Sequence, residues 1–144
     1  MATVDQRVEE RLGEHGVRYT RGRRSVVAAL TRAEGPRSAA ELARTLGAGV
    51  PVSSLYRSLG VLEEAGVVSP HHLSRGVTRY ELAEWLSGHH HHLICVECGS
   101  VEDVEVPRGR EAVILELVGA LTASSGFEPL DHVLEIEGRC GRCR

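Results

Sequence analysis

Residues 38–66 read SAAELARTLGAGVPVSSLYRSLGVLEEAG, and this stretch decides the fold of the first half of the chain. Ser38 is a suitable N-cap for a helix over residues 39–46, and Gly47-Ala48-Gly49 predicts a turn. A second helix follows Pro51 and ends near Gly66, a glycine well placed as a C-cap. Each helix has one apolar face at helical spacing, formed by Ala39, Leu42, Ala43 and Leu46 in the first and by Val52, Leu55, Leu59 and Leu62 in the second. The stretch therefore predicts two helices joined by a short turn.

The segments on either side extend this pair into a longer order of elements. Upstream, residues 4–14 and the residues after Thr20 predict two more helices. Downstream, residues 67–69 and 77–82 predict two strands, and residues 73–76 the turn between them. Helix, turn, helix and hairpin is the order of a winged helix-turn-helix, although any small helical domain with a hairpin would show it too.

The second half of the chain predicts a smaller α+β unit. Residues 84–88 are typical of a linker, residues 93–95 and 101–106 of strands, residues 111–121 of an apolar helix, and residues 133–137 of a final strand. A unit of about 55 residues has a thin core, so a bound metal or a dimer partner would help it to fold. The whole chain is predicted to be α+β.

Charge divides the chain in the same way. Residues 1–83 hold 12 Arg against 9 Asp and Glu, whereas residues 84–144 hold 5 Arg against 11 Asp and Glu. A basic first part suits phosphate, and an acidic second part suits cations. The 144 residues contain no long apolar run and no signal-peptide pattern, so we expect a cytoplasmic protein that does not contact the membrane.

Four cysteines form two pairs with the same spacing. Cys95-Val96-Glu97-Cys98 opens the second half and Cys140-Gly141-Arg142-Cys143 closes the chain. In a reducing cytosol such pairs favour a metal site over disulfides, and two pairs complete the tetrahedron that zinc prefers. Because four thiolates leave no open position, we assign this site to structure and not to catalysis.

The run His89-His90-His91-His92 comes directly before the first cysteine pair. If it is extended, His90 and His92 share one face and His89 and His91 the other, so one short stretch can supply two metal ions. The plainer alternative is an exposed polar loop. Each face needs further ligands, and the candidates are Glu81, His71 and His72 upstream and Glu111 and His132 downstream.

The start of the second helix carries candidates for nucleic-acid contact. Ser53, Ser54, Tyr56 and Arg57 lie where the recognition helix of a helix-turn-helix meets base edges. On the preceding helix, Arg21, Arg23 and Arg24 could contact phosphate. For each arginine, an ordinary position on a solvent-exposed helix face is an equally plausible interpretation.

Together, these motifs resemble the ferric uptake regulator (Fur) family of bacterial metal-sensing repressors. The resemblance rests on features that occur in the family's order, namely Thr20-x-x-Arg23, residues 54–59 (SLYRSL), Tyr80-Glu81-Leu82, residues 89–99 (HHHHLICVECG) and the final Cys140-x-x-Cys143. It spans almost the whole chain. It implies a homodimer with a winged-helix DNA-binding domain over residues 1–83, a hinge with sensor ligands over 84–92, and a dimerisation domain with structural zinc over 93–144.

The resemblance also implies roles for single residues. Cys95, Cys98, Cys140 and Cys143 match the structural zinc ligands, Glu81, His90 and His92 the sensor site, and His89, His91 and His132 a further site in which Glu111 is the expected carboxylate. Tyr56 and Arg57 match DNA-contacting positions. His71, His72 or Glu64 could supply a fourth sensor ligand. The segment Ala33-Glu34-Gly35-Pro36 departs from the family pattern, since iron- and peroxide-sensing members usually offer a His there.

The expected activity is metal-dependent binding of a palindromic double-stranded DNA operator, with no small organic substrate. For the regulatory metal we rank Zn²⁺ first, Fe²⁺ second and Ni²⁺ third, since imidazoles with one carboxylate suit all three. Two alternatives remain open. A zinc-dependent hydrolase would use the His cluster, but no His-Glu-x-x-His motif and no oriented nucleophile is present. A passive zinc-binding interaction module would bind no DNA.

Overall fold

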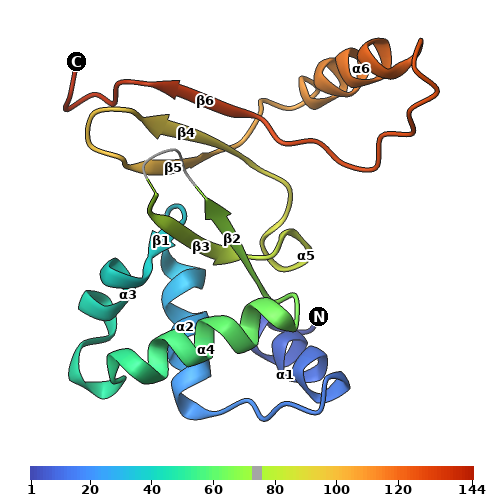
Figure 1. The fold of residues 1–144 in the computed structure, drawn as a ribbon. Coiled ribbons are helices and arrows are strands. Elements are labelled where there is room, and N and C mark those ends of the chain that lie inside the picture. Colours follow the sequence, from blue (N-terminus) through green and yellow to red (C-terminus); the bar gives the residue numbers. More distant parts are fainter. Residues whose placement is uncertain (73–75) are drawn as a thin grey trace. The chain divides into compact units, whose positions relative to one another are not determined.

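The computed structural model describes residues 1–72 and 76–144 and divides the chain into two compact units, Met1–Gly88 and His89–Arg144 (Figure 1). The two units are called unit 1 and unit 2 below. In the described part of the chain, no helix is both long and apolar enough to cross a membrane. The architecture is α+β, as the sequence predicts, with a winged helix-turn-helix in unit 1.

Unit 1 is built around four helices, α1 (Val4–Glu14), α2 (Arg21–Arg32), α3 (Ala39–Leu46) and α4 (Val52–Glu64). Side-chain caps start three of them. Thr3 and Ser38 form reciprocal capping boxes with Gln6 and Glu41 on α1 and α3, and the Thr20 hydroxyl accepts a hydrogen bond from the Arg23 N–H on α2. A 3₁₀ turn over Gly47–Gly49 separates α3 from α4, so the predicted helix, turn and helix are confirmed.

A three-stranded sheet completes unit 1 in the order β1-β3-β2. Strands β2 (Val68–His72) and β3 (Thr78–Leu82) form the antiparallel hairpin, called the wing below. The tip that was predicted as a turn lies, over residues 73–75, outside the described residues. Strand β1 (Arg37–Ser38) pairs with β3 and was not predicted, because two residues are too short to show alternation.

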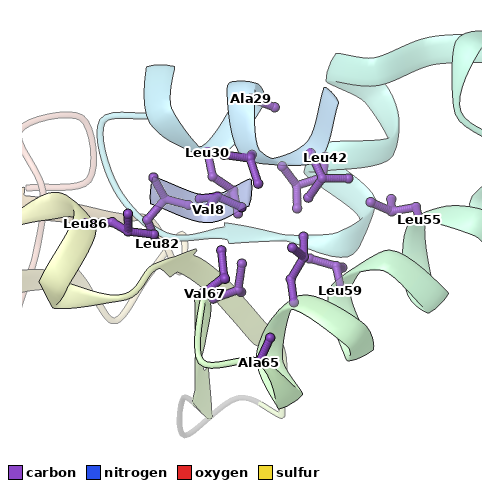
Figure 2. Close-up of a cluster of buried hydrophobic side chains, with 14 of the residues drawn as sticks. Val8, Ala29, Leu30, Leu42, Leu55, Leu59, Ala65, Val67, Leu82 and Leu86 are labelled. Carbon is purple, nitrogen blue, oxygen red and sulfur yellow. The ribbon is translucent and has the colours of Figure 1, made fainter. Parts of the chain in front are cut away.

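The core of unit 1 collects the apolar faces of all four helices and both wing strands (Figure 2). Leu55, Leu59 and Leu62 of α4 are at most 1% exposed, and they pack with Val8, Leu42 and Val67. Burying one such side chain contributes about 1.5–3 kcal/mol. This core holds α4 in place and leaves its opposite face free for a partner.

Unit 2 contains a second three-stranded sheet, in the order β5-β4-β6, and one long helix. Strand β4 (His91–Cys95) is central. It pairs antiparallel with β5 (Val101–Val104) and parallel with β6 (Glu135–Gly138), and α6 (Glu111–Thr122) lies between β5 and β6 in the chain. Since β4 and β6 run parallel, the segments that follow them leave the sheet at the same end (Figure 1). One cysteine pair starts at the last residue of β4, and the other comes shortly after β6.

The segment 84–88 corrects one prediction. Glu84–Ser87 is a short helix, α5, where a linker was expected. Its residue Leu86 is buried in the unit 1 core, which explains why the segment is ordered. The division between the units falls after Gly88, within the predicted hinge, and the role of residues 84–92 as a hinge stays a prediction.

Candidate metal centres and DNA-facing helix

The four cysteines of unit 2 converge on one point. Their Sγ atoms all lie within 4.8 Å of one another, and Cys98 Sγ is 3.8 Å from Cys140 Sγ. Sulfurs about 2.3 Å from a tetrahedral zinc would be about 3.8 Å apart. Parallel pairing of β4 with β6 produces this convergence across 41 intervening residues. The donor set and its spacing therefore fit zinc.

The surroundings of Cys95 and Cys98 favour the thiolate form. Hydrogen bonds from the backbone at Cys98 and Cys140 lower the pKa of Cys95 to about 6, and the Cys140 N–H lies 3.3 Å from Cys95 Sγ. The side chain of Ser100 lowers the pKa of Cys98. Hydrogen bonding with Cys140 raises the pKa of Cys143 to about 12, because the neighbouring sulfurs crowd negative charge together. Such crowding is relieved by a cation at the centre.

The histidine run alternates as predicted. The rings of His89 and His91 are 4.7 Å apart and those of His90 and His92 are 5.1 Å apart, which confirms that each pair occupies its own face. On the first face, His89, His91 and His132 surround the carboxylate of Glu111, the first residue of α6. Their Nε2 atoms lie 2.9, 3.0 and 2.6 Å from its oxygens.

The charges of this cluster of three histidines and Glu111 suit a cation. The hydrogen bond from His91 lowers the pKa of Glu111 to about 2, with smaller contributions from His132 and His89. His91 is 2% exposed, while Glu111 and His89 are about one-third exposed, so the cluster can be reached from solvent. Three imidazoles and one carboxylate fit zinc, ferrous iron or nickel.

On the other face of β4, His90 and His92 share Asp103. Their Nε2 atoms lie 3.6 and 3.4 Å from Asp103 Oδ1. Asp103 of β5 pairs in register with His92, which places the carboxylate beside both rings. This carboxylate was not predicted from the sequence. Only the strand register reveals it, because Asp103 lies eleven residues beyond His92 in an ordinary acidic stretch.

In unit 1, the wing brings together two other predicted sensor residues. His71 of β2 and Glu81 of β3 point to the same face, and His71 Nε2 lies 2.5 Å from Glu81 Oε1. His72 is exposed on the other face, and its Nδ1 lies 3.3 Å from Thr78 Oγ1. Glu64 is exposed at the end of α4. Within unit 1, His71 is therefore better placed beside Glu81 than His72 is.

The predicted DNA contacts cluster at the start of α4. Ser53, Tyr56 and Arg57 are exposed, with Tyr56 at 57%, and Ser54 is partly exposed, all opposite the buried face of Leu55 and Leu59. These side chains offer hydroxyl and guanidinium donors on one accessible surface.

The arginines of α2 divide into two groups. Arg21 is exposed, and Arg23 donates to the Arg18 carbonyl, so both remain near the surface. Arg24 forms salt bridges with Asp5 and Glu9 of α1 and stacks over Tyr19 at 4.0 Å. It joins α1 to α2, and a phosphate contact by Arg24 is therefore not supported.

Comparisons with known proteins agree with the fold. The model of the ferric uptake regulator family matches residues 14–137. A ferric uptake regulation protein of Neisseria meningitidis is 33% identical over 117 residues, which are 79% of this chain and 76% of the relative. The Vibrio cholerae ferric uptake regulator superposes with a TM-score of 0.74 at 27% identity, over 92% of this chain and 98% of its own. A zinc-bound manganese uptake regulator superposes with a TM-score of 0.71 at 31% identity, over the same shares of each chain.

Proposed function

The chain belongs to the ferric uptake regulator family, and from this membership we propose that it is a metal-dependent repressor that binds a palindromic DNA operator as a homodimer. One observation carries the proposal. The ligand pair His90 and His92, with Asp103 beside it, begins two residues after the end of the winged-helix unit, where a bound ion would act on both units. We place the protein in the cytoplasm, where its DNA would be.

We assign Cys95, Cys98, Cys140 and Cys143 to structural zinc, since their sulfurs already have the spacing of a tetrahedral site. These residues join the two ends of unit 2, at the start of the β4–β5 turn and after β6. Their proposed role is to hold together the ends of β4 and β6. Bound zinc would supply four strong bonds where unit 2 has little apolar core.

We assign the sensor site to His90, His92 and Glu81, and we add Asp103 as a further carboxylate. His71, which faces Glu81 on the wing, replaces the imidazole that the segment after α2 lacks. His72 points to the other face of the wing and is left out. The set mixes imidazole with carboxylate, and we keep the order zinc, then ferrous iron, then nickel. A structural neighbour of this chain is a zinc-bound manganese uptake regulator, so a protein of this fold can hold zinc.

The cluster of His89, His91, Glu111 and His132 is proposed as a third site, within unit 2. It joins the strand β4 to the first residue of α6. We therefore expect it to hold the start of α6 beside β4, and not to report metal to the DNA-binding unit.

The proposed dimer rests on the apolar surface of α6. Val113, Leu115, Leu117 and Leu121 are between 54% and 72% exposed. Large exposed apolar patches mark association surfaces, and a two-fold dimer would cover the same patch on both subunits. This chain alone leaves the face uncovered, which supports unit 2 as the dimerisation domain.

In such a dimer, two copies of α4 would enter successive major grooves, about 34–36 Å apart on DNA. Ser53, Ser54, Tyr56 and Arg57 would contact bases and the backbone, and Arg21 and Arg23 phosphates. A bound ion would restrict the orientation of unit 1 relative to unit 2, so metal and operator would favour each other by about 1–3 kcal/mol. The relative from Vibrio cholerae is described as having rearranged DNA-binding domains, which supports this kind of reorientation.

The double variant His90→Ala/His92→Ala tests the proposal. Operator affinity is measured by mobility shift on the protein's own upstream DNA, with zinc, ferrous iron or nickel added separately. We expect metal-dependent binding to be lost while the dimer and the Cys-site zinc are retained. The matched control, His72→Ala, removes an exposed imidazole and should keep the response. Unchanged metal-dependent binding in the double variant would exclude the sensor assignment.

Members of the family are transcription regulators, and this favours a regulator over both the zinc hydrolase and the passive zinc module. A zinc hydrolase would catalyse the turnover of a substrate, which we do not expect of a member of this family. A passive zinc module would show no metal-dependent shift in the mobility experiment.

A further inference from the structure

Ser100 comes shortly after the first cysteine pair and lies against one of its sulfurs. Its Oγ is 3.2 Å from Cys98 Sγ, and the two groups share a hydrogen bond. The backbone of Ser100 is held as well, because its carbonyl accepts a hydrogen bond of 2.9 Å from the Cys95 N–H. The next residue, Val101, is 4% exposed and pairs in register with Ile94 of β4. The turn and the strand pairing therefore hold the hydroxyl group beside Cys98.

The direction of this hydrogen bond follows from the state of the sulfur. A thiol could donate to the Ser100 oxygen, but zinc is bound by a thiolate, which carries no proton and can only accept. With zinc on Cys98, the hydrogen between the two atoms therefore belongs to Ser100. Such a bond withdraws electron density from the sulfur, and a less basic thiolate is a weaker nucleophile.

Cys98 is the ligand for which this bond matters most. Among the four cysteines, all of which lie in the described part of the chain, Cys95 is buried, Cys140 and Cys143 are half-buried, and Cys98 is exposed. A cavity of about 320 Å³ lies beside the site, and its wall includes Cys95, Ser100 and Cys140. A molecule as small as hydrogen peroxide fits into it, since a water molecule takes about 30 Å³. Small oxidants can therefore approach the cysteine site.

We propose that Ser100 is a positioning residue of the cysteine site, whose hydroxyl donates to the Cys98 thiolate and makes this ligand resistant to peroxides. The inference rests on the zinc that we propose for the four cysteines. In the reaction that is slowed, a sulfur lone pair attacks one oxygen of hydrogen peroxide and the O–O bond breaks. The sulfur loses two electrons and becomes a sulfenic acid, and the peroxide is reduced to hydroxide and that S–OH oxygen. A sulfenic acid is a poor zinc ligand, so Ser100 protects the retention of zinc.

The first measurement is the rate at which hydrogen peroxide releases zinc. The protein is prepared without air and dialysed until zinc remains only at the cysteines, and a chromogenic chelator reports the release. In Ser100→Ala, the loss of a hydrogen bond to a charged sulfur should make that sulfur about 10–100-fold more basic. Nucleophilicity rises with roughly the square root of basicity, so release should be about three- to tenfold faster. Without peroxide, the variant should hold as much zinc as the wild type.

Two further substitutions separate the hydroxyl from the space that it fills. Ser100→Thr and Ser100→Val have nearly the same shape, and both introduce β-branched residues that suit the start of a strand. The Thr variant keeps the hydroxyl and should release zinc at about the wild-type rate, whereas the Val variant should match Ser100→Ala. Because these two variants are compared with each other, the test does not depend on Ser100→Ala.

The position of the oxidation is a separate readout. Sulfenic acid is trapped with dimedone and located by mass spectrometry, and in Ser100→Val the increase should be at Cys98. Ser125→Ala is the control elsewhere in unit 2, since the Ser125 hydroxyl donates to the Thr122 carbonyl and not to a sulfur. It should leave the release rate unchanged.

A spectroscopic measurement tests the same electronic effect without an oxidant. In protein that holds Co²⁺ in place of zinc, a near-ultraviolet charge-transfer band reports electron donation from sulfur to the metal. Histidine ligands do not give this band, so it observes the cysteine site alone. A more electron-rich sulfur should move the band to longer wavelength in Ser100→Val and leave it in place in Ser100→Thr.

The outcomes distinguish this proposal from the ones beneath it. Equal release rates in Ser100→Thr and Ser100→Val would overturn the role of Ser100 and leave the zinc at the cysteines in place. A wild-type protein that holds no zinc at the cysteines would overturn the structural-zinc assignment, and this proposal with it. None of these measurements uses DNA, so the repressor function stands or falls separately in the mobility-shift experiment.

Discussion

Unit 1 and unit 2 bury their side chains in very different ways. In unit 1, seventeen buried residues form one apolar cluster, and most of them come from α1 to α4 and the sheet. In the described part of unit 2, the buried apolar residues are Ile94, Cys95 and Val101, and they are joined by the buried imidazoles of His91 and His92. Meanwhile all three leucines of α6 are exposed. Unit 1 is therefore held by apolar packing, whereas unit 2 has little apolar core of its own, which suits the structural zinc and the dimer partner that we propose for it.

The largest expected effect comes from breaking the cysteine site. Cys95→Ser, or removal of zinc by a strong chelator, should abolish the folded state of unit 2 and its dimer, because structural zinc in small domains contributes about 10–16 kcal/mol of apparent binding energy. Unit 1 should remain folded. Circular dichroism and amide exchange of each unit would show this. Cooperative loss of both units together would contradict the difference drawn between them.

The reverse experiment is Leu59→Ala in unit 1. Leu59 is 1% exposed, and its truncation should cost about 2–5 kcal/mol of unfolding free energy by leaving a cavity. Denaturant unfolding followed by the fluorescence of Trp85 would report it. The zinc content, measured by elemental analysis, should stay at the wild-type value. A parallel loss of zinc would mean that the two units do not fold independently.

Leu117→Glu on α6 addresses the partner that unit 2 is proposed to need. Leu117 is 57% exposed, so the folded subunit should change by no more than about 0.5 kcal/mol. A charge buried in the interface should weaken the dimer at least about tenfold, in line with a loss above 1.4 kcal/mol. Sedimentation across a concentration series measures this. Glu116→Gln, at the neighbouring exposed position, is the control, and a Leu117→Glu dimer of wild-type affinity would remove α6 from the interface.

The smallest effect concerns pH in unit 2. The pKa of Glu111 is about 2, below its ordinary value near 4.5, because His91 and two other imidazoles form hydrogen bonds with its carboxylate. A lowered pKa in the folded state stabilises the fold above the ordinary value, and this stability is lost as the pH falls from about 4.5 towards 2. Glu111→Gln should therefore show a shallower loss of unit 2 stability over that range. The carboxyl titration of Glu111, followed by NMR in protein free of metal at this cluster, should move upwards in His91→Ala.

The contrast between local and long-range contacts also explains which features could be predicted from the sequence. Helices α1 to α4 follow from caps and from leucine spacing, since Ser38 and Leu55 act through neighbours three or four residues away. The alternation of His89 to His92 follows from strand geometry alone. The helix at Trp85 was missed because four residues show no periodicity, and its order comes from α1 and from the end of α4. Asp103 was missed because only pairing between β4 and β5 places it beside His92.

By itself, the sequence determined the kinds of ligand and the local elements, since residue chemistry and short-range spacing are properties of the chain. It supplied four cysteines and a histidine run with ligand spacing, and it placed a Tyr-Arg pair on a predicted helix. The tertiary structure decided which distant groups meet. Parallel pairing of β4 with β6 joins Cys98 to Cys140, the wing register sets His71 against Glu81, and two salt bridges turn Arg24 towards α1. Such contacts depend on strand register and core packing, which join residues that the sequence keeps far apart.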